Sequence, residues 1–239
     1  MTAEPQHVLV TGSTRGIGRA IAEGLIERGS SVVGHGRTDM GNVLGADLAE
    51  PGAAEDLWAR ALERLRGRID VLINNAGVYD PIAVDAEAAA WRAAWTRTLQ
   101  INLQASADLC RLAVLHWRAQ ERPGRIVNVA SRAAWRGDSL DYWHYGASKA
   151  GMVAMTRSIA RAYAAEGILA FAVCPGFVAT EMAETHLGGA EGARIVGEIP
   201  LGRVTTPEEV ANATVYLALD APSSMTGAAL DINGGSYVR

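Results

Sequence analysis

Lysine is nearly absent from this chain of 239 residues, because Lys149 is the one lysine among 22 lysines and arginines. Cysteine is also scarce: Cys110 and Cys174 are far apart in apolar stretches, which favours two buried free thiols over a disulfide. The five histidines show no metal-ligand spacing, so we expect no metal site. No apolar run approaches the roughly 20 residues of a membrane-spanning helix, and no signal peptide begins the sequence. We therefore expect a cytoplasmic protein without membrane contact.

Size and charge narrow the class of protein further. The chain is 49% hydrophobic, which is enough to bury a substantial core, and its length favours one domain over residues 1–239. Its net charge is −4 and its arginines are scattered rather than clustered. Because such a surface provides no cationic field for a phosphodiester backbone, we expect no nucleic-acid partner.

Short apolar segments alternate with longer helical segments along the whole chain. Segments this apolar are typical of strands buried on both faces, and their alternation with helices requires right-handed crossovers. The pattern therefore predicts an α/β fold with a single Rossmann-type, doubly wound parallel sheet flanked by helices on both faces. Expected strands are 7–11, 31–36, 69–75, 124–131, 168–174 and 228–232, and expected helices are 17–28, 53–66, 95–118, 145–166 and 207–219.

A glycine-rich loop, TGSTRGIG at 11–18, links the first strand to the first helix. Its spacing is G-x-x-x-G-x-G rather than the G-x-G-x-x-G of the common dinucleotide signature. The physical roles can still be assigned: Gly12 allows a tight turn, Gly16 lets a pyrophosphate approach the backbone, and Gly18 allows close helix packing. An ordinary strand-to-helix turn would also use glycine.

The end of the second strand distinguishes NADP(H) from NAD(H). A carboxylate there would bind the ribose 2′-hydroxyl of NAD(H), whereas a 2′-phosphate favours arginine. The sequence places Arg37 at this point and a second arginine, Arg15, inside the glycine loop. NADP(H) is therefore favoured over NAD(H), because guanidinium groups bind phosphate in a bidentate manner. The alternative is that Arg37 is an ordinary surface charge.

Tyr145 and Lys149 are four residues apart and would project from one face of a helix. Lowering a phenol pKa from about 10 to about 7 requires roughly 4 kcal/mol. One ammonium at about 4 Å supplies a similar energy at an effective dielectric constant near 20. The pair is therefore a candidate acid/base, although such a spacing also arises by chance.

Taken together, these motifs resemble the short-chain dehydrogenase/reductase family over essentially the whole chain. The resemblance rests on the order and spacing of TGSTRGIG, GADL, NNAG, INLQ, GRIVNVAS, YGASK, PGFVATEM and the C-terminal PLGRVTTPEEVA and TGAALDINGG. It implies an enzyme that transfers a hydride between a nicotinamide and a ketone or secondary alcohol. A 3-oxoacyl-carrier-protein reductase is a subordinate alternative, and a non-catalytic NADP(H)-binding regulator is an alternative of another class.

The resemblance implies four catalytic residues. Tyr145 would be the general acid/base, Ser131 would hydrogen-bond the substrate oxygen, Lys149 would lower the tyrosine pKa and hold the nicotinamide ribose, and Asn102 would anchor a water of the proton path. Including these motif positions, the expected cofactor-binding residues are Gly12, Ser13, Thr14, Arg15, Gly16, Ile17, Gly18, Arg37, Asp47, Leu48, Asn74, Ala76, Gly77, Tyr145, Lys149, Pro175, Gly176, Val178 and Thr180.

The substrate side is the part that departs from the family pattern. The segment between Ser131 and Tyr145 is one residue longer than in many members, and it contains Trp135 and Trp143. With Ser131 and Phe177, these two tryptophans are the expected substrate residues, which predicts an apolar or aromatic pocket for a small-molecule carbonyl or alcohol. Residues 181–200 are a candidate substrate lid, with an ordinary surface connection as the alternative. The family also implies a homotetramer or homodimer.

Overall fold

The protein is built around one seven-stranded sheet in which every strand pairing is parallel. The computed structural model describes residues 5–180 and 189–239. The strand order is β3-β2-β1-β4-β5-β6-β7, so the direction of winding reverses between β1 and β4. In such sheets ligands bind at the carboxyl ends of the strands near this reversal. The strands are β1 (His7–Val10), β2 (Ser31–Gly36), β3 (Val43–Gly45), β4 (Val71–Asn74), β5 (Gly124–Val129), β6 (Ile168–Pro175) and β7 (Ala229–Ile232).

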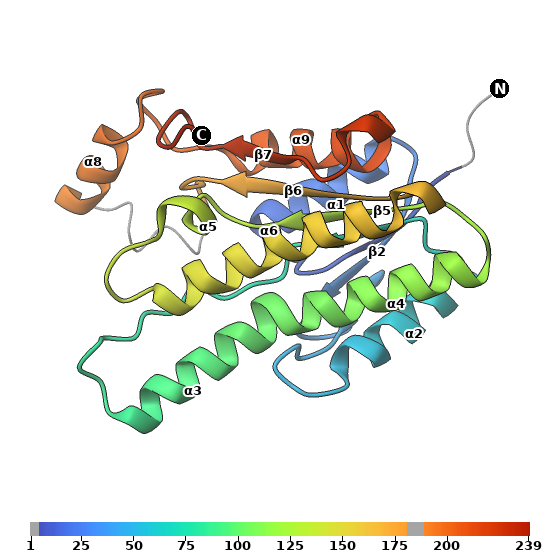
Figure 1. The fold of residues 1–239 in the computed structure, drawn as a ribbon, viewed down its shortest axis with the longest axis horizontal. Coiled ribbons are helices and arrows are strands. Elements are labelled where there is room, and N and C mark those ends of the chain that lie inside the picture. Colours follow the sequence, from blue (N-terminus) through green and yellow to red (C-terminus); the bar gives the residue numbers. More distant parts are fainter. Residues whose placement is uncertain (1–4, 181–188) are drawn as a thin grey trace.

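Helices cover both faces of the sheet, as the sequence predicts (Figure 1). Along β1, Leu9 packs with α2 and α4 on one face, while Val8 and Val10 pack with α1 and α9 on the other. This alternation follows from the two-residue period of a strand, and it explains why almost every strand residue is apolar. The main helices are α1 (Gly16–Glu27), α2 (Ala53–Arg64), α4 (Ala105–Ala119), α6 (Trp143–Tyr163) and α9 (Pro207–Leu219).

Several elements differ from the expectation. The helix expected over 95–118 is three segments: α3 (Ala88–Leu99), a π-helical turn η1 (Gln100–Gln104) and α4. The expected helix 145–166 is α6 followed by a 3-10 turn, η2 (Ala164–Glu166). β3 was not expected from the sequence, because its three residues are too few to show a strand period. The short helices α5 (Ala133–Arg136) and α8 (Gly189–Gly197) and the 3-10 turn η3 (Ser223–Met225) were also not expected.

α9 begins at Pro207, as expected, and a capping box precedes it. Pro207 occupies the first turn, and the Thr206 hydroxyl accepts a hydrogen bond from the Glu209 backbone N–H at 3.3 Å. In return, the Thr206 backbone N–H donates to the Glu209 carboxylate at 2.8 Å. This reciprocal capping box satisfies two backbone donors that a helix start otherwise leaves unpaired.

Other expectations have mixed outcomes. Cys110 and Cys174 are buried free thiols, as predicted. Within the described ranges, no helix has both the length and the apolar character needed to cross a membrane. Residues 181–188 of the candidate lid lie outside the described residues, and the rest of the lid contains α8.

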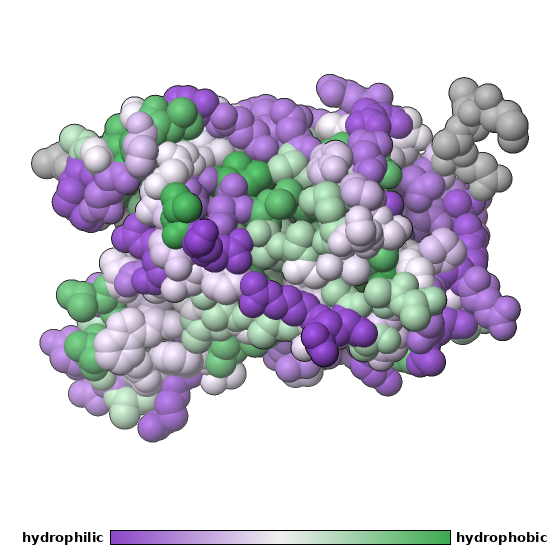
Figure 2. Space-filling model, turned by 45° about the horizontal axis from the view of Figure 1, so that its top comes forward, coloured by the Kyte–Doolittle hydropathy of each residue, from purple (hydrophilic) through white to green (hydrophobic). Residues whose placement is uncertain are grey.

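The face that carries α6 and β7 is rich in apolar side chains (Figure 2). Ala147 and Ala154 on α6 are exposed, and Leu230 and Ile232 on β7 are half-buried. Small and apolar residues on an exposed helix and on the edge strand of a sheet provide a surface that another protein subunit can cover.

Candidate active site

The glycine loop at the carboxyl end of β1 is packed too closely for side chains. Gly12 has φ +66° and Gly16 has φ +51°, both in the left-handed region that favours glycine. A Cβ atom on Gly18 would lie 2.0 Å from the Gly12 carbonyl oxygen and 2.4 Å from Asn75 Nδ2. The loop therefore presents bare backbone at the N-terminus of α1, where a helix favours an anion.

The glycine loop is fixed by two residues that the sequence analysis did not assign to the site. Asn75 Nδ2 donates to the carbonyl oxygens of Thr11 and Gly12, each at 3.0 Å. The Gly12 backbone N–H donates to His35 Nδ1 at 3.1 Å, while His35 Nε2 lies 3.0 Å from the Ala46 carbonyl oxygen. These contacts require the neutral imidazole that carries its proton on Nε2. Burial lowers the His35 pKa and so favours this neutral form.

The second strand is shaped to receive the same loop. A Cβ atom on Gly34 would lie 2.2 Å from Ser13 Oγ, and one on Gly36 would lie 2.5 Å from Thr14 Cγ2. Ser13 is buried and its backbone N–H donates to the His35 carbonyl oxygen at 2.9 Å. The glycines on β2 therefore let the glycine loop lie directly against the strand.

The two arginines predicted to bind a 2′-phosphate are both exposed. Arg15 is the residue before α1, and Arg37 directly follows β2. The nearest acid along the chain, Asp39, accepts a hydrogen bond from the Gly45 N–H at 3.0 Å and pairs with Arg60. That carboxylate is therefore already engaged at β3.

The remaining residues predicted for the adenine end differ in their surroundings. Asp47 is exposed and its Oδ1 accepts a hydrogen bond from the Ala49 N–H at 3.0 Å, while Leu48 is buried. Asn74 is fully buried, and its Nδ2 donates to Asn128 Oδ1 on β5 at 2.9 Å. Asn74 thus joins two central strands. The Ala76 N–H donates to Thr11 Oγ1 at 3.0 Å, which ties the NNAG segment to β1.

The segment after β6 returns to the glycine loop. Gly176 packs against Asn233, where a Cβ atom would lie 2.9 Å from the Asn233 Cβ. Val178 is buried and pairs with Thr205, while a Cβ atom on Gly16 would lie 3.1 Å from Thr180 Cγ2. A hollow of about 210 Å³ is lined by residues that include Gly16 and Thr180, both predicted to bind cofactor. Pro175 accepts a hydrogen bond from the Arg132 N–H at 2.9 Å.

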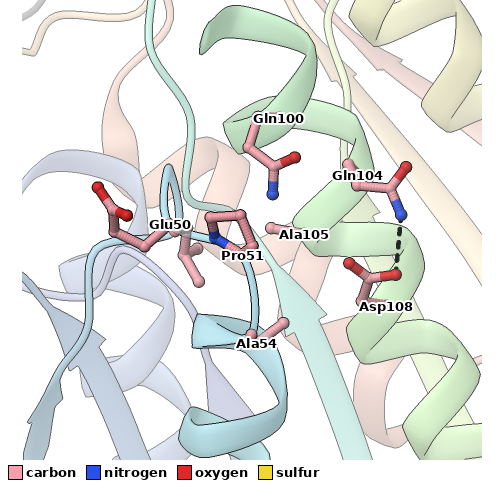
Figure 3. Close-up of a pocket in the computed structure, with 9 residues that line it drawn as sticks. Glu50, Pro51, Ala54, Gln100, Gln104, Ala105 and Asp108 are labelled. Carbon is pink, nitrogen blue, oxygen red and sulfur yellow. Dashed lines mark hydrogen bonds between the residues drawn. The ribbon is translucent and has the colours of Figure 1, made fainter. Parts of the chain in front are cut away.

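A second hollow lies away from this region (Figure 3). It has a volume of about 160 Å³ and lies between the Glu50–Gly52 connection and the helical segment that carries Gln100, Gln104 and Asp108. It shares only Leu48 with the residues predicted to bind cofactor or substrate. We therefore do not place the active site there.

Lys149 and Asn102 lie together below the NNAG turn. Lys149 is buried and its Nζ donates to the Val129 carbonyl oxygen at 2.9 Å. Asn102 lies in the π-helical turn, accepts a hydrogen bond from the Val78 N–H at 2.8 Å and donates to the Val78 carbonyl oxygen at 3.0 Å. A Cβ atom on Gly77 would lie 3.3 Å from Asn102 Oδ1 and 3.5 Å from Lys149 Nζ. A role for Asn102 in anchoring water stays a prediction.

Ser131 lies close enough to Tyr145 for a side-chain hydrogen bond that lowers the Tyr145 pKa. Ser131 Oγ also accepts a hydrogen bond from the Ala133 N–H at 3.1 Å, so it caps a turn as well. Lys149 Nζ lies 5.9 Å from the centre of the Tyr145 ring. The structure therefore brings the predicted acid/base, hydroxyl and cation together at the carboxyl edge of the sheet.

The protonation of this pair differs from the expectation. Burial raises the pKa of Tyr145 to about 12, and the Ser131 hydrogen bond offsets this only in part. Burial also lowers the pKa of Lys149 to about 8. The lowering of the phenol pKa by the ammonium is therefore not seen in this structure, because loss of solvent dominates both groups.

Of the predicted substrate residues, Trp135 and Trp143 do not lie against Tyr145. The Trp135 ring is stacked between the guanidinium groups of Arg157, at 4.7 Å, and Arg239, at 4.0 Å. Trp143 is 51% exposed and packs edge-on against Trp91 at 5.7 Å. Both tryptophans are thus engaged by other parts of the fold.

A tyrosine that was not expected from the sequence lies beside Tyr145 instead. The Tyr79 ring packs edge-on against Tyr145 at 4.7 Å and stacks on Tyr142 at 3.9 Å. The Tyr79 hydroxyl donates to Asp138 Oδ1 at 3.3 Å, and burial raises the pKa of both groups. The predicted Phe177 lies under the guanidinium of Arg132 at 4.8 Å. Tyr79, two residues after the NNAG segment, is the one sequence signal that would have indicated these contacts to Tyr145.

A parallel sheet with a glycine loop at its reversal point and a hydrogen-bonded tyrosine beside a buried lysine is typical of dinucleotide-dependent dehydrogenases and reductases. The family model described as enoyl-(acyl carrier protein) reductase matches residues 12–237. The chain belongs to this short-chain dehydrogenase/reductase family, and it is an oxidoreductase.

Known proteins are similar to this chain over nearly its whole length. The chain is 34% identical to the 3-oxoacyl-[acyl-carrier-protein] reductase FabG of Salmonella typhimurium over 100% of both proteins. It is 34% identical to the L-rhamnose 1-dehydrogenase (NAD(P)(+)) of Azotobacter vinelandii, with 97% of this chain and 96% of the relative covered. A solved Agrobacterium tumefaciens structure with bound NADP, assigned as a 2-deoxy-D-gluconate 3-dehydrogenase, matches with a TM-score of 0.88 and 30% identity over 99% and 98% of the chains.

Replacing Gly18 with alanine should destabilise the protein by about 1–3 kcal/mol, because the new Cβ overlaps the Gly12 carbonyl. Gly24→Ala in the same helix is the matched control. Its Cβ would meet only Val215 Cγ2 at 3.4 Å, so we expect no loss and a gain of up to about 1 kcal/mol from helix propensity. Urea unfolding measures both changes. Equal stability of the two variants would contradict the packing role of Gly18.

Proposed function

We propose that this chain transfers a hydride between NADP(H) and a ketone or secondary alcohol, with Tyr145 as the general acid/base. The observation that carries the proposal is the placement of Tyr145 and Ser131 beside the buried ammonium of Lys149, at the carboxyl edge of the sheet. The reduced cofactor supplies the hydride when it is bound.

The residues present fit a phosphorylated dinucleotide. The cradle of Gly12, Gly16 and Gly18 is backbone that added Cβ atoms would fill, and it opens at a helix N-terminus suited to a pyrophosphate. Arg15 and Arg37 are exposed at the strand ends where a 2′-phosphate would need cations. Two solved relatives contain NADP, which supports the same preference here.

The protonation states suit carbonyl reduction. With a pKa of about 12, Tyr145 keeps its proton at neutral pH and can donate it to an oxyanion as the hydride arrives. Ser131 is placed to donate a second hydrogen bond to that oxygen. Lys149 spends one of its three donors on Val129, which leaves two for a ribose hydroxyl and a proton relay. In the reverse direction the same phenol would have to be ionised, which burial disfavours.

We further propose a homodimer or homotetramer as the working form. The apolar face of α6 and β7 supports this, because it exposes small and apolar residues on a helix and an edge strand (Figure 2).

Tyr145→Phe should reduce turnover by about 10²- to 10⁴-fold, because the ring stays while the proton donor is lost. NADPH affinity, measured by fluorescence titration, should not change. Tyr163→Phe, at the far end of the same helix, is the control and should retain full turnover. A fully active Tyr145→Phe enzyme would contradict the proposed reaction. If the wild type bound NADPH but reduced no ketone or carrier-protein thioester, the protein would be a cofactor-binding regulator.

NADPH affinity and kcat/KM for NADPH should fall as the pH rises through about 8, where Lys149 loses its proton and its charge. The loss should approach tenfold per pH unit, with no separate change near pH 10 because Tyr145 stays protonated to about 12. In Lys149→Met, NADPH binding should be weak and should not vary between pH 7 and 10. A wild-type profile that is flat across this range would contradict the assignment of Lys149.

Arg37→Ala should reduce the preference for NADPH over NADH by about 10- to 100-fold, because a charge-assisted hydrogen bond is lost. The ratio of kcat/KM values for the two cofactors measures this preference. Arg28→Ala is the control: Arg28 lies at the opposite end of α1 and pairs with Asp220 at 3.0 Å. An unchanged ratio in Arg37→Ala would remove this arginine from cofactor discrimination.

A further inference from the structure

Arg132 is a buried cation directly after Ser131 in the chain. Only 8% of the residue is exposed, and its backbone N–H is fixed by the Pro175 carbonyl. Its guanidinium donates to Ser236 Oγ and lies over the Phe177 ring at 4.8 Å. Within the described ranges the guanidinium forms no salt bridge and no other side-chain hydrogen bond. A guanidinium has five N–H donors, so most of its donor capacity is not used by these residues.

Burying a cation without a paired carboxylate is costly, and burial lowers the Arg132 pKa accordingly. Other arginines of this chain show how such a charge is normally satisfied. Arg68 lies 2.8 Å from Asp70, and Arg203 lies 2.8 Å from Glu209. Arg125, which is half-buried and has no carboxylate partner among the described residues, donates to the carbonyl oxygens of Leu217 and Ala221 instead. Arg132 has neither arrangement, and a bound anion would satisfy it.

The surroundings place this cation on the substrate side of the site. Tyr79 and Asp138 both lie within its electrostatic reach, and Tyr79 packs against the Tyr145 ring. Arg132 thus lies near two residues that surround the acid/base, and it also directly follows Ser131 in the chain. An anionic group a few bonds from the reacting carbon could therefore meet Arg132.

The local charge favours a carboxylate over a phosphate. Asp138 and Glu198 are both within electrostatic reach of Arg132, so the region already holds negative charge. Each negative charge on a ligand interacts unfavourably with these two acids, so a monoanion is favoured over a dianionic phosphate. Arg136 is the competing cation, but it is paired with Glu198 at 3.9 Å.

We propose that Arg132 binds a carboxylate carried by the substrate, so that the enzyme acts on short oxo acids or on the corresponding hydroxy acids. The proposal rests on the proposed function and specifies its substrate class. Sugar acids belong to this class, and solved relatives include proteins assigned as gluconate dehydrogenases. Arg132 would act as a specificity-determining residue, and the guanidinium plane would receive the carboxylate through two parallel hydrogen bonds.

Matched ketone pairs that differ only in charge test this proposal. NADPH oxidation is followed with 3-oxobutanoate and 4-oxopentanoate, with their methyl esters, and with 5-keto-D-gluconate. Wild type should show kcat/KM values at least about 10-fold higher for each acid than for its ester. In Arg132→Gln that ratio should fall by about 10- to 100-fold, through KM rather than kcat. Arg132→Lys should recover part of the preference, and the control Arg136→Gln should keep the wild-type ratio.

The outcomes separate the two proposals. If wild type reduces ketones but prefers the esters, or if Arg132→Gln keeps the wild-type ratio, the role of Arg132 is overturned while the proposed function stands. If Arg132 had only a structural role, its replacement would lower stability without changing the acid-to-ester ratio of kcat/KM. Thermal unfolding of each variant measures that stability. If the enzyme preferred dihydroxyacetone phosphate to dihydroxyacetone but did not prefer the acids to their esters, the proposal that Arg132 binds a carboxylate would be overturned. If the wild type reduced none of these ketones, the proposed function itself would be contradicted.

Discussion

The site depends on one buried ammonium. Lys149 is the only lysine in the chain, and it lies where little space is available for a larger cation. A Cβ atom on Gly77 would lie 3.5 Å from Lys149 Nζ, and the Val129 carbonyl oxygen lies 2.9 Å away. A planar guanidinium needs more room and presents its donors in a fixed fork, whereas an ammonium can turn its three donors toward several acceptors. This explains why a chain that otherwise uses arginine retains lysine here.

Burial of that ammonium also determines the electrostatics of the site. A simple estimate with one cation near a phenol predicts an acidic tyrosine, but the same burial that positions Lys149 removes water from both groups. The pKa values therefore move toward the neutral forms, to about 8 for Lys149 and about 12 for Tyr145. The resulting site holds a protonated phenol, which is the form that an acid needs. The estimate failed because it included the attraction between the charges and omitted their desolvation.

The layered fold could be predicted because its signal is local. Strands such as β6 are apolar throughout, so their composition alone indicates a buried strand. α9 begins with a proline and two acids, and these residues are typical of a helix start. The π-helical turn around Asn102 could not be predicted, since one extra residue in a helical turn leaves no change in composition. Likewise β3 is only three residues long, and its pairing with β2 decides its structure.

For the candidate site, the sequence indicates residues within motifs but not those that support them from elsewhere. His35 contacts the Gly12 N–H from a neighbouring strand, and no local pattern distinguishes it from an ordinary strand residue. The substrate side shows the same limit. Aromatic residues between Ser131 and Tyr145 suggest an apolar or aromatic pocket, yet Trp135 packs against two arginines and Trp143 packs on Trp91. These two rings are engaged elsewhere, and the aromatic contact to Tyr145 comes instead from Tyr79, whose hydroxyl donates to Asp138.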